Sequence, residues 1–172
     1  MKTLVIHPED PTTHFLDAVY IETDWTIVTD NLIRKSKLVE LISNHDRIIM
    51  LGHGTGHGLI GKSRYMIDPT YVYLLRDKDL VCMWCNADLF VELYGLKGFY
   101  TGMIISEDME AEYCKVPYAE GHVNESNVLF TKALTESIQN TPKDMYQKMR
   151  EIYVPSPNNE VMEYNAKRLY YL

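Results

Sequence analysis

Little in this chain of 172 residues points outside the class of ordinary globular proteins. It contains only three cysteines, Cys82, Cys85 and Cys114, and an odd number this small argues against a disulfide framework. No apolar run approaches the roughly 18 residues that a membrane-spanning helix needs. The lysines and arginines form no basic cluster, and the formal net charge is −7. We therefore expect neither a membrane nor a nucleic acid among the partners of this protein.

Secretory and repetitive features are missing as well. Residues 1–8 contain one lysine and an apolar run that is too short for a signal peptide. There is no internal repeat and no long linker, and hydrophobic residues make up 46% of the chain, which is enough for a substantial core. These features predict a cytoplasmic protein with reduced cysteines and a single domain over residues 1–172. The sequence gives no indication of the oligomeric state.

Apolar runs with strand character alternate with helical patterns over the first two thirds of the chain. The predicted strands are 2–7, 25–29, 47–51, 80–84 and 99–106. Helices are predicted at 69–75 and 87–94, and a small hairpin at 59–67. A further helix is predicted before the third strand, with Asp30 or Ser36 as its N-cap. This alternation predicts an α/β fold, in which a mostly parallel twisted sheet carries helices on both faces.

From about residue 122 the pattern becomes helical. Asn124 is a predicted N-cap, followed by apolar residues that recur about every 3.6 positions. Thr141 begins a second helix, because a capping hydroxyl followed by proline is typical of a first turn. Residues 160–172 fit either a helix or a last strand at 168–171. The C-terminal part of the domain is therefore predicted to be mostly helical.

Two reactive side chains follow predicted strands. His53 lies in a glycine-rich segment directly after the strand 47–51. Cys85 comes at the end of the strand 80–84. The carboxyl ends of parallel strands meet at one edge of a sheet, so we expect the two side chains to lie close together. A cysteine needs a nearby base to act as a nucleophile, and histidine is its usual partner. The pattern favours a cysteine hydrolase.

The order of these motifs resembles a known family. The sequence Leu51-Gly-His53-Gly54, the hairpin from Leu59 and the sequence Met83-Trp-Cys85 are similar to the caspase-like cysteine peptidases. This group includes the caspases, legumains, gingipains, clostripain, separase and the CHAT domains. The resemblance covers residues 2–106 and implies a caspase-like three-layer sandwich.

The resemblance also implies roles for individual residues. His53 would be the general acid and base, Cys85 the nucleophile, and the N–H groups of Gly54 and Cys85 the oxyanion hole. The family pattern requires no third catalytic residue, and we expect no cofactor and no metal. The expected partner is a peptide or protein substrate, which the protein would cleave as an endopeptidase.

The pocket of such a peptidase is built partly by the loop after the first strand and by the segment after the fifth. In this chain these segments carry pairs of carboxylates, namely Glu9, Asp10, Glu107 and Asp108. Carboxylates in a substrate pocket would favour a basic residue before the cleaved bond, through direct charge pairing.

Two alternatives remain open. Family members carry small residues around the nucleophile, whereas here Trp84 precedes it and Asn86 follows it, so an inactive interaction or regulatory module of the same fold is the second reading. The third is a thiol-redox or metal protein, because Cys82 and Cys85 form a C-x-x-C motif. Residues three apart on a strand point to opposite faces, so we expect Cys82 to point away from Cys85.

Overall fold

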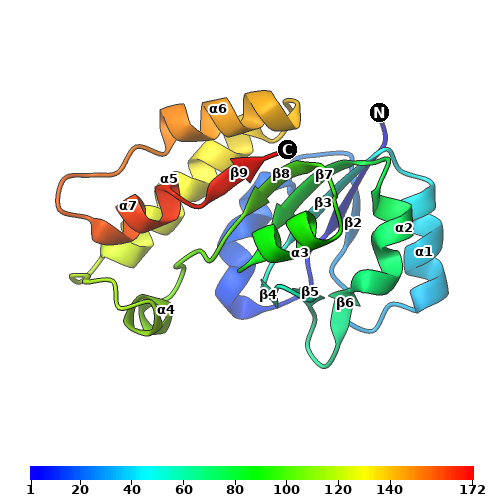
Figure 1. The fold of residues 1–172 in the computed structure, drawn as a ribbon, viewed down its shortest axis with the longest axis horizontal. Helices are drawn as coiled ribbons and strands as arrows, with labels where there is room; N and C mark the ends of the chain where they lie inside the picture. Colours follow the sequence, from blue (N-terminus) through cyan, green and yellow to red (C-terminus); the bar gives the residue numbers. More distant parts are fainter.

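A computed structural model describes all 172 residues and shows a six-stranded sheet between two layers of helices (Figure 1). The strands lie in the order β2-β1-β3-β7-β8-β9. Their bounds are Thr3–Ile6 for β1, Thr26–Val28 for β2, Arg47–Leu51 for β3, Asp79–Met83 for β7, Gly98–Thr101 for β8 and Leu169–Tyr171 for β9. The first five run parallel and β9 pairs antiparallel with β8. The predicted α/β class is confirmed.

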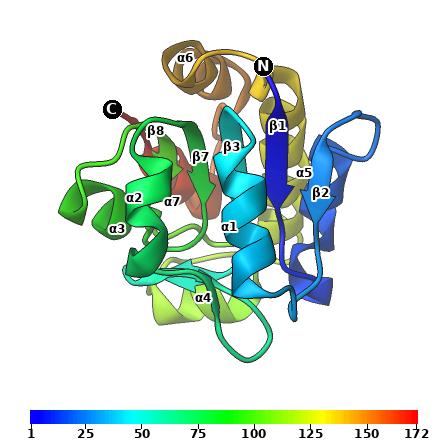
Figure 2. The same ribbon diagram turned by 90° about the vertical axis from the view of Figure 1, so that its right-hand side faces the viewer.

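The central strands β1, β3, β7 and β8 are buried on both faces, because alternate residues enter different cores. Leu4 and Ile6 face one core and Val5 the other. The first core is covered by α1 (Lys35–Ser43), α2 (Val72–Leu75) and α3 (Ala87–Leu93). The second is covered by the 3₁₀ helix η1 (Pro11–Val19), α5 (His122–Ser137), α6 (Pro142–Ile152) and α7 (Glu160–Ala166). Figure 2 shows α1 in front of the sheet and α5 behind it.

A second, small sheet extends from the edge at which β3 ends. Its strands β4 (Gly54–Thr55), β5 (Gly58–Ile60) and β6 (Tyr65–Ile67) are antiparallel. This confirms the predicted hairpin and adds β4, which begins directly after His53. The 3₁₀ helix η2 (Pro69–Tyr71) then leads into α2, where a short helix was predicted.

Two predicted helix caps are wrong. Neither Asp30 nor Ser36 caps α1. The Asp30 carboxylate accepts a hydrogen bond from Leu32 N in a turn well before the helix, and Ser36 is already inside α1, whose N-cap position is Arg34. Asn124 lies inside α5, which begins earlier, after Gly121. That glycine has φ +86°, a left-handed conformation that side chains rarely adopt. Positive-φ glycine is a less specific start signal than asparagine, and the pattern favoured the wrong residue.

The strand predicted at 99–106 ends at Thr101 instead. Beyond it, Ile105 has a side chain rather than a strand as its hydrogen-bonding partner. Ile105 N donates to Asn165 Oδ1 at 2.8 Å, and Asn165 Nδ2 donates to the Ile105 carbonyl at 2.9 Å.

The segment from 160 forms both α7 and β9, so the two readings of the tail are each correct for part of it.

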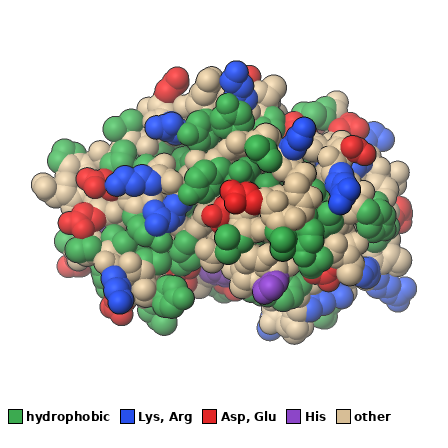
Figure 3. All heavy atoms as spheres, viewed as in Figure 1, with side chains coloured by type: hydrophobic (Ala, Val, Ile, Leu, Met, Phe, Trp, Pro, Cys, Tyr) green, Lys and Arg blue, Asp and Glu red, His purple; other side chains and the backbone are tan.

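The surface of the face shown in Figure 3 has lysines and arginines spread among acidic and hydrophobic side chains, without a continuous basic area. None of the helices has both the length and the apolar composition of a membrane-spanning segment.

Candidate active site

His53 and Cys85 follow equivalent positions of two neighbouring strands. Leu51 pairs with Met83 in the β3–β7 ladder, and each predicted catalytic residue comes two positions later. Gly52 N donates to the Met83 carbonyl at 3.1 Å, which extends the ladder towards the site. His53 and Cys85 line the same pocket, which has about 480 Å³ of empty space including its open mouth.

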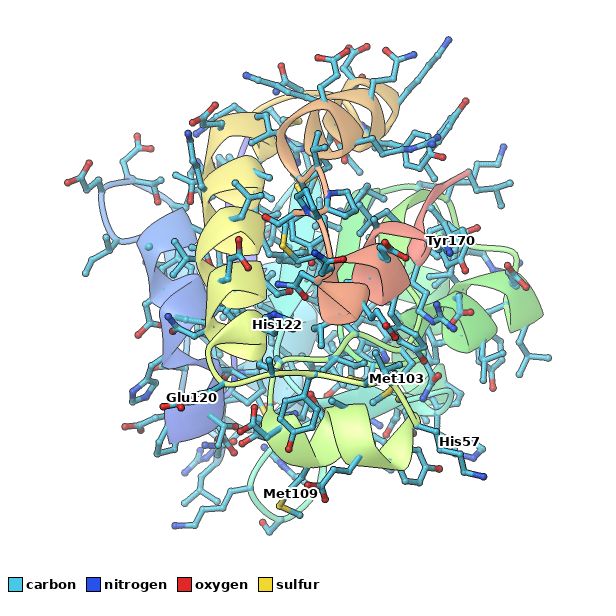
Figure 4. The ribbon with its side chains drawn as sticks, turned by 90° about the vertical axis from the view of Figure 1, so that its left-hand side faces the viewer. His57, Met103, Met109, Glu120, His122 and Tyr170 are labelled. Atoms are coloured by element: carbon cyan, nitrogen blue, oxygen red, sulfur yellow. The ribbon has the colours of Figure 1, made fainter.

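The walls of this pocket come from distant parts of the chain. Leu16, Met83 and Phe130 supply apolar surface, and Ile104 and Ser106 come from the segment that connects β8 with α4 (Asp108–Tyr113). In Figure 4, Met103 marks this segment and His122 marks the start of α5. Apart from His53 and the Cys85 thiol, no ionisable side chain lines the pocket.

The polar side chains around the pocket are largely engaged with the protein itself. Thr101 Oγ1 donates to the Trp84 carbonyl at 3.1 Å, and Asn127 Nδ2 donates to the Ser106 carbonyl at 2.9 Å. The amide of Asn165 is occupied by the backbone of Ile105, as described above. The lining of the pocket is therefore mainly apolar and contains no carboxylate.

The Cys85 side chain lies between a backbone carbonyl and a carboxylate. Its Sγ donates to the Ile104 carbonyl at 3.4 Å and lies 3.9 Å from Glu110 Oε1. Burial, and secondly the Glu110 carboxylate, raise the pKa of Cys85 to about 12. No hydrogen bond joins Cys85 to His53. The backbone N–H of Cys85 donates to no carbonyl, as expected of a group that is free to bind an oxyanion.

Glu110 is held beside the thiol by the start of α4. Its Oε2 accepts hydrogen bonds from Ser106 N at 2.7 Å, from Ser106 Oγ at 3.0 Å and from Glu107 N at 3.1 Å. This reciprocal arrangement is a capping box, which stabilises the first turn of a helix. The carboxylate that opposes ionisation of Cys85 is thus fixed by local structure.

The ring of His53 contacts the loop after β1. Its Nε2 lies 2.6 Å from Thr12 Oγ1 and 4.0 Å from Asp10 Oδ1. Asp10 is the N-cap of η1 and accepts hydrogen bonds from Thr12 N at 2.9 Å and from Thr12 Oγ1 at 2.6 Å. The predicted base His53 is therefore hydrogen-bonded to η1, the helix that follows the first strand.

Trp84 packs between the segment that carries Cys85 and the segment that carries His53. It is 2% exposed, and its Nε1 donates to the Thr55 carbonyl at 3.0 Å. A Cβ at Gly54 would lie 2.0 Å from Trp84 Cδ1 and 2.6 Å from the Gly58 carbonyl oxygen, so only glycine fits there. The residue before Cys85 thus packs on the residue after His53. Asn86, with φ +64°, supplies the left-handed turn into α3 that asparagine tolerates well.

The other predicted site residues lie apart from the pocket. None of the four carboxylates lines it: Glu9 and Asp10 border neighbouring pockets, Glu107 is the N-cap of α4, and Asp108 is in its exposed first turn. Gly54 is next to His53 but is not part of the lining.

Cys82 is buried in the core that α1, α2 and α3 cover, whereas the apolar lining of the Cys85 pocket comes mainly from the other core. Burial raises the pKa of the Cys82 thiol. The structure therefore does not bring the two cysteines of the C-x-x-C motif together. His57 is exposed and points outwards at the edge of the molecule in Figure 4.

Sequence reasoning missed Thr12 and Glu110. Asp10-Pro11-Thr12 carries the signal that correctly predicted α6 at Thr141, namely a capping side chain followed by proline. The position of Glu110 beside Cys85 depends on a tertiary contact across 25 positions, for which no sequence signal exists.

A buried histidine fixes the helix that carries Thr12. His7 Nδ1 lies 2.8 Å from Tyr20 Oη, and Nε2 lies 3.0 Å from Thr13 Oγ1. Tyr20 Oη donates to Asp17 Oδ1 at 2.6 Å, so the tyrosine oxygen accepts from His7. Burial lowers the pKa of His7, and the Asp17 carboxylate opposes this shift.

This histidine should make the fold sensitive to acid. The folded pKa of His7 lies below the unfolded value of about 6.5, so the unfolded chain binds the proton first as the pH falls. Below pH 6.5 the free energy of unfolding therefore decreases with falling pH, by at most about 1.4 kcal/mol per pH unit. We expect His7→Gln to flatten the dependence of the unfolding free energy between pH 7 and 5, measured by urea denaturation. His57→Gln should retain the wild-type slope. An unchanged slope in His7→Gln would assign the acid sensitivity to other groups.

Comparisons of the chain with protein-family models, with curated proteins and with solved structures gave no match.

Proposed function

We propose that this protein is a cysteine hydrolase of the caspase-like type, in which Cys85 attacks a peptide carbonyl and His53 transfers the protons. The observation that carries this proposal is the placement of His53 and Cys85 at equivalent positions of adjacent parallel strands, on one pocket. The order of strand, His-Gly, hairpin, strand and cysteine, which the family resemblance implied, is also the order of elements here.

The protonation state of Cys85 determines how the first step would proceed. Because its pKa is about 12, the thiol has to lose its proton as it attacks, rather than beforehand. The thiol turns from the Ile104 carbonyl towards His53, which accepts the Sγ proton while Sγ bonds to the carbonyl carbon. The carbonyl electrons move to the oxygen, and the N–H of Cys85 binds the oxyanion.

The intermediate then collapses with the help of the same histidine. The protonated ring of His53 donates its proton to the leaving amine, and a thioester between Cys85 and the acyl group remains. Water attacks this thioester while His53 accepts a proton from the water, and the thiol leaves with a proton returned by the ring. The products are a free carboxylate and the original enzyme, with no net transfer of electrons.

A second function is favoured by two observations. The raised pKa of Cys85 and the absence of a Cys85–His53 hydrogen bond are what a non-catalytic interaction module of the same fold would show. The thiol-redox and metal readings gain no support, because Cys82 belongs to the opposite face of the sheet.

The experiment compares two kinds of reagent on the full chain. One is iodoacetamide, and the other is a peptidyl acyloxymethyl ketone with leucine before the reactive group, chosen because the pocket is uncharged. Labelling of each cysteine is followed by peptide mass spectrometry. We expect the peptidyl reagent to select Cys85, and His53→Ala to slow this reaction about 100-fold, the lower range for loss of a general base. Cys82→Ser should have no effect.

The iodoacetamide arm reports the resting thiol. It should label Cys85 slowly at pH 7, because a buried thiol of raised pKa contains little thiolate. Equal reaction of the peptidyl reagent with wild type and His53→Ala would contradict the hydrolase and favour the interaction module.

A further inference from the structure

The hydrogen bonds around Thr12 determine where the protons lie. The hydroxyl of Thr12 has one hydrogen and two polar neighbours, Asp10 Oδ1 and His53 Nε2, each at 2.6 Å. Hydrogen bonds from Thr12, first from its side chain and then from its backbone, hold the pKa of Asp10 below its usual range, so this group is a carboxylate at neutral pH and can only accept. The hydroxyl therefore donates to Asp10, and its oxygen accepts a hydrogen bond from His53.

We propose that Asp10 and Thr12 position His53 by holding its proton on Nε2, which leaves Nδ1 as the atom that takes the proton of Cys85. Thr12 and Asp10 are positioning residues, because neither lines the pocket that His53 shares with Cys85. For its catalytic meaning, this inference rests on the proposed function. It also gives Asp10, predicted to bind substrate, a different role.

The position of the ring between two pockets supports this assignment. One pocket contains Cys85, and the other, with about 280 Å³ of empty space, contains Asp10, Glu9 and Lys62. His53 is the residue that lines both. Nε2 meets Thr12 and Asp10, whereas Nδ1 is the ring nitrogen without a hydrogen-bond partner in the structure. Nδ1 is therefore the nitrogen that is free to accept a proton from Cys85.

The backbone makes this contact a fixed one. Asp10 caps η1, Pro11 occupies its first turn, and Thr12 follows in the same turn. Thr12 N also donates to Asp10 Oδ1, so the carboxylate is held by two bonds independently of His53. The His7 network then ties η1 to the end of β1. An orienting group that fixes the histidine tautomer can govern the rate of such a site.

The chain offers variants that separate positioning from folding. Thr12→Val removes the hydroxyl but keeps the backbone bond from residue 12 to Asp10, and position 12 is exposed, so the fold should persist. Thr12→Ser restores the hydroxyl. Asp10→Asn keeps an acceptor for Thr12 but removes the charge. Glu9→Gln removes an adjacent carboxylate that has no bond to His53 and is the matched control.

The first readout is the ¹⁵N NMR spectrum of the neutral His53 ring, in full-length protein labelled at histidine. We expect the Nε2–H tautomer in wild type, Thr12→Ser and Glu9→Gln, and a mixture of both tautomers in Thr12→Val. Because this measurement does not depend on turnover, it tests the hydrogen-bond chain even if the hydrolase proposal fails. Retention of the Nε2–H tautomer in Thr12→Val would overturn the inference.

The second readout is the maximal rate at which the peptidyl reagent labels Cys85 at saturation. It should fall roughly 10-fold in Thr12→Val, in the range seen when an orienting partner is lost, and return in Thr12→Ser. Asp10→Asn should keep the tautomer and still slow the reaction, because the protonated ring loses its counter-charge. A changed tautomer with an unchanged rate would also overturn the positioning role. If His53→Ala leaves the rate unchanged, the proposed function fails instead, and with it the catalytic role of Asp10 and Thr12.

Discussion

Arg47→Met should lower the free energy of unfolding by about 3–5 kcal/mol, the cost of leaving one charge of a buried pair without its partner. Arg47 is 1% exposed, and its Nε lies 3.6 Å from Asp79 Oδ1. The two residues are paired in the ladder at the start of β3 and β7, at the edge opposite His53 and Cys85. Nη2 of Arg47 also donates to the Asn140 carbonyl, which ties the connection between α5 and α6 to the sheet.

The pH dependence of this variant identifies the cause. Burial raises the pKa of Asp79, and Arg47 opposes that shift. Without Arg47 the folded pKa of Asp79 rises further, so the carboxylate destabilises the fold above its unfolded pKa, and the deficit shrinks as acid protonates it. Unfolding by urea at several pH values measures this.

Two further variants decide whether the lone charge is responsible. Arg47→Met/Asp79→Asn should recover part of the loss at pH 7. Lys37→Met is the matched control, because Lys37 and Glu40 form an ion pair that is 53% and 57% exposed, and its loss should cost less than about 0.5 kcal/mol. If the double variant is no more stable than Arg47→Met, lost packing rather than the lone charge explains the effect.

Trp84→Ala should cost about 3–5 kcal/mol, as expected for a large aromatic side chain removed from a core. The indole packs edge-on against Phe90 with ring centroids 5.7 Å apart, and it holds Thr55 through its Nε1. Since the same ring covers Gly54, the segment after His53 loses its support. We therefore also expect the reaction of Cys85 with the peptidyl reagent to slow by at least the 10-fold that misplacement of a positioned group costs.

Leu93→Ala on the neighbouring helix α3 is the control for Trp84→Ala. Leu93 is 69% exposed, so its truncation should change stability by less than about 0.5 kcal/mol and leave the labelling rate unchanged. Unfolding and labelling are measured on the same samples, well below the denaturation midpoint. A destabilised Trp84→Ala protein that still labels at the wild-type rate would show that the indole supports the core but not the position of His53.

The sequence was sufficient for the fold class and for the placement of His53 and Cys85, because both follow from local patterns. Runs of buried strand residues define the sheet, and the carboxyl ends of parallel strands share one edge. The role of Trp84 could not be predicted, because its contact with Gly54 is a tertiary one between the residue before Cys85 and the residue after His53. The neighbourhood of Cys85 could not be predicted either, since Glu110 and Ile104 reach the thiol through tertiary contacts.

The hydrogen bonds between Asn165 and Ile105 also affect the order in which the site forms during synthesis of the chain. The two residues are 60 positions apart, and a ribosome that adds 5–20 residues per second needs roughly 3–12 s between them. During this interval the nascent chain already contains His53, Cys85 and the apolar Met83 side chain of the pocket. It does not yet contain the Asn165 amide that holds Ile105, the neighbour of the Ile104 carbonyl to which the thiol donates. Until the helix α7 has been synthesised, this segment lacks its anchor, so we expect the Cys85 thiol to be more accessible to oxidants in the nascent chain than in the folded protein.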